Sequence, residues 1–205
     1  MSVVAPAGIS PRDAAVLHGM KVRRGAWVFA VILLVTLAAD QATKAWARTL
    51  PVSPSGCAQP VDLLSARCAG VPQPVVHGFW DWELAYNPGA AFSSLATLSH
   101  DVTQLVLLLA AAALIGISVV ALRTRPEERL KRASLALVAG GALGNLIDRL
   151  RHGAVTDFVR WRIHDHRWPI FNVADAALLV GVILLMVSGM SWFDGRKARH
   201  QAVAV

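Results

Sequence analysis

The sequence contains few charged residues. Only 16% of its 205 residues are Asp, Glu, Lys or Arg, whereas 55% are hydrophobic. This composition excludes an ordinary soluble domain and favours a membrane protein. The formal net charge of +7 does not indicate nucleic-acid binding, because the basic residues lie in clusters between apolar runs and are not interleaved with aromatic residues on one face. We therefore expect no nucleic-acid partner.

Common catalytic motifs are also missing. The chain has no GxSxG and no HExxH sequence, which excludes the serine and zinc hydrolases that carry these motifs. His164 and His166 lie close together in a short segment, but no further ligands accompany them at the spacing of a metal site. We interpret both as solvated loop residues, and the sequence predicts no metal site and no cofactor.

Cysteine occurs only twice, at Cys57 and Cys68, in a segment rich in Pro and Ser. In an oxidising compartment these residues would form a disulfide bond that closes a short loop, and the alternative is two free thiols. We expect the disulfide bond.

Long apolar runs, by contrast, are abundant. Crossing a bilayer core of about 30 Å takes roughly 20 helical residues. We predict spans at residues 25–46, 102–122, 133–150 and 169–193. A cleavable signal peptide is the alternative for the first run, but its polar lead of 24 residues is long and the run continues past Asp40. The sequence therefore predicts an all-α membrane protein with four transmembrane helices.

The distribution of basic residues predicts the orientation of these helices. Four crossings place both termini on one side, and twelve of the 20 Lys and Arg residues flank the spans on that side. Since basic residues concentrate on the cytoplasmic side of membrane proteins, we expect both termini to be cytoplasmic. The chain then divides into a tail at residues 1–24, a four-span domain at 25–194 and a tail at 195–205.

Two segments between the predicted spans have the pattern of external strands. In residues 80–87, side chains alternate between two faces. The first face would carry Trp80, Trp82, Leu84 and Tyr86, and the second Asp81 and Glu83. Residues 157–171 add Trp161 and Trp168. Because Trp and Tyr favour the membrane interface, we expect a small external β-rich platform and an interfacial segment over the helices. A folded loop without membrane contact is the alternative.

Placing an ionisable side chain within a transmembrane span costs at least about 2.5 kcal/mol of free energy. Each such residue is therefore expected to have a structural or functional role. Asp40 precedes Lys44 by four positions, the favourable order for an ion pair within a helix, and we interpret the pair as structural support. Gly140 and Gly144 have the small-residue spacing that permits close helix approach. Asp148 lies on a polar stripe facing the bundle interior, where we expect it to lock the helices by hydrogen bonds.

Asp175 has no basic residue within a helical turn, so the local sequence supplies no counter-ion. Asp157 is the best candidate partner, because the short segment before it can bring the chain back over the helices. Two carboxylates that share one proton can hydrolyse an amide, since one takes a proton from water while the other polarises the carbonyl. Fixed donors would stabilise the charge of the transition state, and the candidates are Asn145, Asn172 and Arg149.

Four motifs occur in order along the chain. They are DQATK at residues 40–44, NPGAAFS at 87–93, GNLIDRLRHGAVTDF at 144–158 and FNVAD at 171–175. One of them alone would be weak, but four in order on a four-span chain are highly specific. By these motifs the chain resembles the lipoprotein signal peptidase family, also called signal peptidase II, which comprises bacterial membrane aspartyl peptidases. The resemblance extends over residues 27–192.

The resemblance implies a role for each matching residue. The catalytic aspartates would be Asp157 and Asp175. The residues that line the site and position the substrate would be Asn87, Gly89, Asn145, Arg149 and Asn172, while Asp40, Lys44 and Asp148 would hold the architecture. The implied substrate is a diacylglyceryl-modified prolipoprotein, cut on the amino side of its lipidated cysteine at the outer face of the bacterial cell membrane. The resemblance also implies contact with membrane lipid and inhibition by globomycin, and we expect a monomer.

A different class of function is a small four-helix proton-linked transporter that uses the same buried acids. Such a carrier should show an inverted repeat with broken helices near the bilayer midplane. The sequence shows no internal repeat, and its acids cluster at one end of the spans. A non-catalytic scaffold would not explain Asp175, an acid within a span that has no counter-ion nearby. The sequence therefore favours the peptidase.

Overall fold

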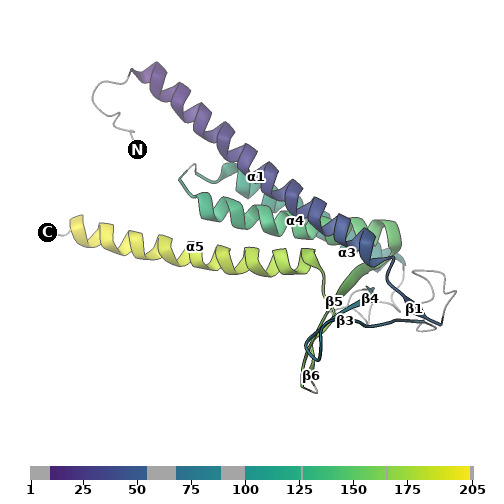
Figure 1. The fold of residues 1–205 in the computed structure, drawn as a ribbon. Helices are drawn as coiled ribbons and strands as arrows, with labels where there is room; N and C mark the ends of the chain where they lie inside the picture. The colour runs from purple at the N-terminus through teal and green to yellow at the C-terminus, as the bar shows by residue number, and fades with distance from the viewer. Residues whose placement is uncertain (1–9, 55–67, 89–99, 126, 165, 204–205) are drawn as a thin grey trace.

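In a computed structural model of the chain, the described residues are 10–54, 68–88, 100–125, 127–164 and 166–203. Within them lie four helices and two small antiparallel sheets (Figure 1). The helices are α1 (Pro11–Ala47), α3 (His100–Arg123), α4 (Arg129–His152) and α5 (Val173–Val203). The strands are β1 (Val52–Ser53), β2 (Ala69–Gly70), β3 (Gln73–Val76), β4 (Trp80–Asn87), β5 (Val155–Ile163) and β6 (His166–Arg167).

The helices form a bundle with the larger sheet at one end. The start of α1 and the end of α5 lie at the opposite end from this sheet (Figure 1). Helix α4 packs against α1, α3 and α5. Phe29, Ala121 and Leu135 belong to the apolar core where α1, α3 and α4 meet. The sheet therefore caps the end of the bundle at which α1 ends and α5 begins.

Glycines in α4 allow its neighbours to approach closely, as their spacing predicted. A Cβ added at Gly140 would lie 2.8 Å from the Cβ of Thr36 in α1, and one at Gly144 would lie 2.3 Å from an oxygen of Asp40. On the other side of α4, a Cβ at Gly141 would lie 2.5 Å from the carbonyl oxygen of Ala174 in α5. Helices α1 and α5 therefore both pack almost backbone to backbone with α4.

The larger sheet has the strand order β3-β4-β5-β6. Trp82 pairs with Val159 and Ala85 with Asp157, so β4 carries one extra residue between these two pairs. Such a bulge shifts the alternation of side chains by one position. The prediction that Tyr86 shares a face with Trp82 is therefore wrong, because Tyr86 pairs with Thr156, on the opposite face of β5.

The two acids of β4 share a face, as predicted. Asp81 forms an ion pair with Arg162 at 2.6 Å, and Glu83 pairs with Arg160. The other face of the sheet packs its aromatic side chains onto the end of α1, where Trp46 lies edge-on to Trp82 with ring centroids 5.1 Å apart. These contacts fix the sheet against the bundle.

The helix boundaries differ from the predicted spans most clearly at three helix ends. Helix α5 continues to Val203, within the predicted tail 195–205. Helix α1 begins at Pro11, inside the predicted tail 1–24. Helix α5 begins at Val173, after the predicted start of the span at Pro169, because Phe171 exchanges backbone hydrogen bonds with Val159 and so extends the sheet.

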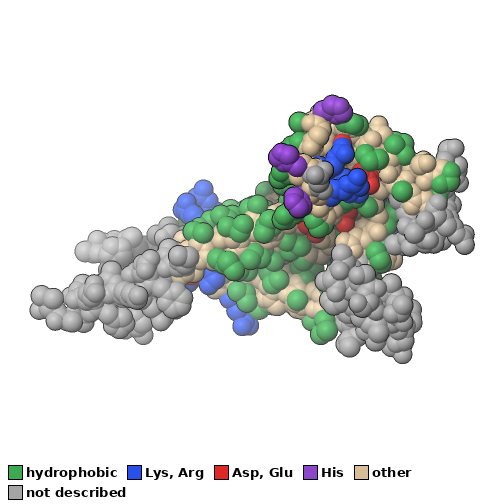
Figure 2. All heavy atoms as spheres, turned by 90° about the horizontal axis from the view of Figure 1, so that it is seen from below, with side chains coloured by type: hydrophobic (Ala, Val, Ile, Leu, Met, Phe, Trp, Pro, Cys, Tyr) green, Lys and Arg blue, Asp and Glu red, His purple; other side chains and the backbone are tan. Residues whose placement is uncertain are grey.

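Length and apolar composition support membrane crossing most strongly for α1. Its segment Arg24–Ala47 is long and apolar enough to cross a bilayer, whereas the apolar parts of α3 and α5 are the shorter segments Leu107–Arg123 and Val173–Gly189. Hydrophobic side chains nevertheless cover the visible shafts of the helices (Figure 2). The four crossings stay a prediction.

Candidate active site

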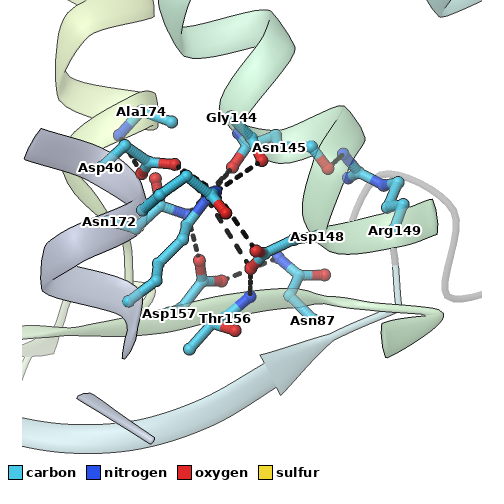
Figure 3. A network of polar contacts seen from close by, with 12 residues as sticks. Asp40, Asn87, Gly144, Asn145, Asp148, Arg149, Thr156, Asp157, Asn172 and Ala174 are labelled. Carbon is cyan, nitrogen blue, oxygen red and sulfur yellow. Dashed lines mark hydrogen bonds and ion pairs between the residues drawn. The ribbon is translucent and has the colours of Figure 1, made fainter. Parts of the chain in front are cut away.

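The residues singled out by the sequence motifs converge at the junction of the bundle and the sheet (Figure 3). Helix α1 contributes Asp40 and Lys44, α4 contributes Asn145, Asp148 and Arg149, the strands contribute Asn87 and Asp157, and the start of α5 contributes Asn172 and Asp175. Gly89 lies outside the described residues. The sequence nominated Asp157 as the partner of Asp175, and in the structure Asn172 contacts both carboxylates.

Asp175 is held by a reciprocal cap at the start of α5. The backbone N–H of Asp175 donates to Oδ1 of Asn172 at 2.9 Å, and the N–H of Asn172 donates to Oδ2 of Asp175 at 3.3 Å. This is the capping-box arrangement, in which the residue before the helix and the third helical residue satisfy each other's free N–H groups. The cap fixes the Asp175 carboxylate at the mouth of the bundle.

Asp157 lies on β5 with 2% of its surface exposed. Its Oδ1 accepts a hydrogen bond from the side-chain amide of Asn172 at 2.7 Å, and its Oδ2 accepts one from Asn87 at 3.2 Å. Burial, reinforced by the negative charge of Asp175, raises the pKa of Asp157 to about 7, although both amides and the charge of Lys44 act in the opposite direction. Both protonation states of Asp157 are therefore accessible near neutral pH.

Asn145 and Asn172 join the two carboxylates into one network. Asn145 donates through Nδ2 to Oδ1 of Asp175 at 2.8 Å. Its Oδ1 accepts from Nζ of Lys44 at 2.8 Å and from Nδ2 of Asn172 at 3.2 Å. Since Asn172 also donates to Asp157, the side-chain amides of Asn145 and Asn172 together connect the two carboxylates.

The predicted structural acids surround Lys44 and occupy the other side of the network. Lys44 lies 2.9 Å from Asp40 and 3.8 Å from Asp148, and all three side chains are fully buried. Asp40 also accepts a hydrogen bond from the backbone N–H of Ala174 at 3.0 Å, which ties α1 to the start of α5. Buried charges persist only when paired in this way, and losing one partner is costly.

Arg48 is a member of the network that the sequence patterns did not reveal. Its Nη2 donates to Oδ1 of Asp148 at 2.8 Å and to the hydroxyl of Thr156 at 3.0 Å. The N–H of Thr156 in turn donates to Oδ2 of Asp148 at 2.8 Å. Arg48 follows Asp40 and Lys44 at the same four-residue spacing, which was the one available signal. These contacts anchor the strand residue that immediately precedes Asp157.

Arg149 lies at the edge of the site, in the last turn of α4 (Figure 3). Its Nη1 donates a long hydrogen bond, 3.4 Å, to the carbonyl oxygen of Asn145. Its positive charge is attracted most strongly by Asp175 and then by Asp157. Its charge therefore acts on both carboxylates, and among the described contacts no hydrogen bond or ion pair joins the guanidinium to either.

Two further predictions lie away from this network. Within the described ranges, no group of three or more His, Cys, Asp or Glu side chains is arranged to hold a metal ion, and His164 and His166 are exposed. Cys68 is disulfide-bonded. Cys57, its predicted partner, lies outside the described residues, so this pairing stays a prediction.

Comparisons with known proteins agree with the motifs. The family model described as signal peptidase (SPase) II matches residues 32–191. A lipoprotein signal peptidase of Xanthomonas campestris pv. campestris is 36% identical, over 85% of this chain and 93% of the relative, and one of Xanthomonas euvesicatoria is 39% identical, over 83% and 89%.

Solved structures show the same similarity in three dimensions. A bacterial membrane enzyme determined by the in meso method superimposes with a TM-score of 0.60 and 26% identity, over 78% of this chain and 90% of that one. A second bacterial membrane enzyme determined by the in meso method has a TM-score of 0.59 and 25% identity, over 80% of this chain and 87% of that one. Motifs, family model, relatives and fold agree, and the chain belongs to the signal peptidase II family.

Proposed function

We propose that this chain is an aspartyl endopeptidase of the bacterial cell membrane that removes the signal peptide from diacylglyceryl-modified prolipoproteins. It would cut on the amino side of the lipidated cysteine, with Asp157 and Asp175 as the catalytic pair. The observation that carries this proposal is the contact of Asn172 with both carboxylates, at 2.7 Å to Asp157 and through the reciprocal cap to Asp175.

The pair would work with one shared proton. The ionised carboxylate takes a proton from a water molecule as the water oxygen attacks the scissile carbonyl carbon. The protonated carboxylic acid donates a hydrogen bond to the carbonyl oxygen, where negative charge develops. The C–N bond then breaks, the leaving amine takes up a proton from the pair, and the new carboxyl group departs. A pKa of about 7 for Asp157 keeps this proton available near neutral pH.

The amides and Arg149 have separate parts in this scheme. Asn87, Asn145 and Asn172 spend side-chain donors on the two aspartates, so we assign them to orienting the carboxylates and the substrate backbone beside them. Arg149 keeps most of its donors free of short protein bonds in the described structure, and we assign it to stabilising the developing oxyanion. The family resemblance adds Gly89 to the substrate-binding residues.

We also propose four membrane crossings, with both termini in the cytoplasm and the aspartates at the outer face. The concentration of basic residues around the terminal side supports this orientation. The apolar helix shafts, and the polar network at the far end from the start of α1, are consistent with it. A lipid-modified substrate would then reach the aspartates from the membrane. We propose that the enzyme acts as a monomer.

Cleavage of a purified diacylated prolipoprotein in detergent tests the proposal. Asp157→Asn and Asp175→Asn should each reduce kcat by at least about a thousand-fold, because each removes a group that transfers the proton. Glu83→Gln is the matched control, since it neutralises an acid of the sheet that pairs with Arg160 outside the site. Hydrolysis that survives both aspartate substitutions would overturn the assignment.

A further inference from the structure

A second polar region lies at the end of the bundle away from the aspartates. The C-terminal end of α3, the start of α4 and the later part of α5 enclose an open cavity of about 580 Å³. The apolar segments Leu107–Arg123 and Val173–Gly189 both end at residues that line it. The cavity therefore lies at the level where the apolar helix surface gives way to charged residues.

The charged lining of this cavity is mainly positive. Among the described residues, the charged side chains that line it are Arg123, Arg125, Lys131 and one acid, Glu128. Glu128 is partly engaged, because its Oε1 lies 3.7 Å from Nζ of Lys131 and its Oε2 accepts a hydrogen bond from the backbone N–H of Arg125 at 3.1 Å. Two positive charges thus remain in excess, and they face a common space.

A buried arginine behind the cavity holds its wall in place. Arg132 is only 5% exposed, and its Nη2 donates to the carbonyl oxygens of Thr124 at 2.6 Å and Arg125 at 3.2 Å. Gly25 of α1 leaves room for this side chain, since an added Cβ would lie 2.5 Å from the guanidinium. The segment that carries Arg125 is therefore fixed before any ligand arrives, which lowers the entropy cost of binding.

The rest of the lining combines apolar side chains with two hydroxyl groups that are already engaged. Thr124 donates to the carbonyl oxygen of Val120 at 2.8 Å, and Ser188 donates to that of Leu185 at 2.8 Å. Val120 of α3 and Leu185 of α5 line the cavity where the apolar segments of these two helices end. A ligand that fits has an anionic head for the arginines and an apolar tail for these residues. Basic pockets between transmembrane helices on the cytoplasmic side bind anionic lipid head groups in this way. We propose that the cavity binds an anionic phospholipid, with its phosphate between Arg123, Arg125 and Lys131 and an acyl chain along Val120 and Leu185.

Lipid retention by the full-length protein tests this proposal directly. Native mass spectrometry in detergent compares dioleoyl phosphatidylglycerol with dioleoyl phosphatidylcholine at equal concentration. We expect preferential retention of phosphatidylglycerol. Arg123→Gln and Arg125→Gln should each weaken it roughly five-fold, the usual effect of one cation near an anionic lipid surface. Arg129→Gln is the matched control, because Arg129 is exposed in the same segment and does not line the cavity.

Two further variants distinguish a specific lipid site from lipid retention that falls because the protein has misfolded. Glu128→Gln removes the one acid found among the described lining residues and should strengthen retention, which damage to the fold would not do. Gly189→Phe fills the cavity without changing charge, since an added Cβ there meets nothing within 4 Å. Gly116→Phe is its control, because Gly116 is equally open but lies outside the lining. Cleavage of the prolipoprotein by each variant reports whether the aspartate site has folded.

Three results would overturn the proposal. If Arg129→Gln lost as much phosphatidylglycerol retention as Arg123→Gln and Arg125→Gln, the binding would be a diffuse attraction to basic residues at the membrane surface. Unchanged retention in Gly189→Phe would place the lipid elsewhere. Displacement of phosphatidylglycerol by equal concentrations of inorganic phosphate or glycerol 3-phosphate would indicate a free-anion site with no use for the acyl chain.

Discussion

Asp157 shows how strongly its surroundings can act on one side chain. Two asparagine amides donate to its carboxylate, yet burial and the charge of Asp175 raise its pKa to about 7. Lys44 and Arg149 are the cations that face it from α1 and α4. The folded protein thus keeps a proton on this residue at pH values where the unfolded chain would release it.

This retained proton predicts a pH-dependent effect of Asp157→Asn on stability. The folded pKa of about 7 exceeds the ordinary value of 3.8, so the stability contributed by the proton is complete below about pH 4 and is lost as pH rises through 7. The asparagine variant has no proton to lose. The Tm of Asp157→Asn minus the Tm of the parent should therefore increase between pH 5 and pH 8. The increase corresponds to roughly 2 kcal/mol in relative unfolding free energy. A Tm difference that stays constant over this range would contradict the raised pKa.

Arg48 should contribute both to stability and to turnover. Arg48→Ala removes the donor to Asp148 and Thr156 and should cost about 1–3 kcal/mol of unfolding free energy. It should also lower kcat, because Thr156 precedes Asp157. Arg48→Lys should restore activity only in part, since an ammonium lacks the planar fork that reaches both acceptors. Arg151→Ala, at an exposed position of α4, is the control, and unchanged kcat in Arg48→Ala would refute this positioning role.

At the scale of elements, the site depends on how closely three helices can pack. Helix α4 presents glycines to both α1 and α5, and Asp40 of α1 accepts a hydrogen bond from Ala174 of α5. A small displacement of α1 would therefore be transmitted to the start of α5, where Asp175 lies. Helix packing and the position of a proposed catalytic residue are linked through this contact.

Gly144→Ala tests this link. The new methyl group would lie 2.3 Å from an oxygen of Asp40, which is fully buried and cannot move without breaking its ion pair. We expect a loss of about 1–3 kcal/mol in unfolding free energy, together with reduced peptidase activity. Gly116→Ala should instead leave activity unchanged and stabilise α3 by up to about 1 kcal/mol, because its Cβ meets open space. Equal effects of the two substitutions would contradict close packing as the cause.

Local spacing predicted the parts of this arrangement that depend on a single helix. The Asp40–Lys44 ion pair and the close approach at Gly140 follow directly from helical periodicity. The bulge in β4 and the late start of α5 did not, because both depend on backbone pairing between strands distant in sequence. Arg48 was missed for the same reason, since its partner Asp148 lies 100 positions away. The short segment before Asp157 suggested it as the partner of Asp175, and the family resemblance implied the same pair.

For the whole molecule, the two ends of the bundle differ in how their charges are balanced, because acids at the sheet end are paired with Lys44 and Arg48. The end at the sheet holds the buried aspartates, whereas the other end holds the basic cavity between α3, α4 and α5. A membrane enzyme with this polarity should have a single orientation. The proposed peptidase and the proposed lipid site would then face opposite sides of the membrane.

Cysteine accessibility in intact cells tests that orientation. Ile163→Cys places a thiol at a 61% exposed position of β5, and Arg129→Cys places one at the exposed start of α4. A membrane-impermeant maleimide should label Ile163→Cys in whole cells and Arg129→Cys only after permeabilisation. The parent chain, with its own cysteines, measures background labelling. Labelling of Arg129→Cys in intact cells would reverse the proposed topology.

The cap at the start of α5 bears on the emergence of drug resistance. An inhibitor bound between the two aspartates would lie against Asn172, whose oxygen accepts the Asp175 N–H and whose amide donates to Asp157. A mutation that weakened the drug by changing this side chain would also uncap the helix and remove the 2.7 Å hydrogen bond to the Asp157 carboxylate. Escape mutations are therefore expected to avoid position 172, and compounds designed to bind that amide should retain their potency longest.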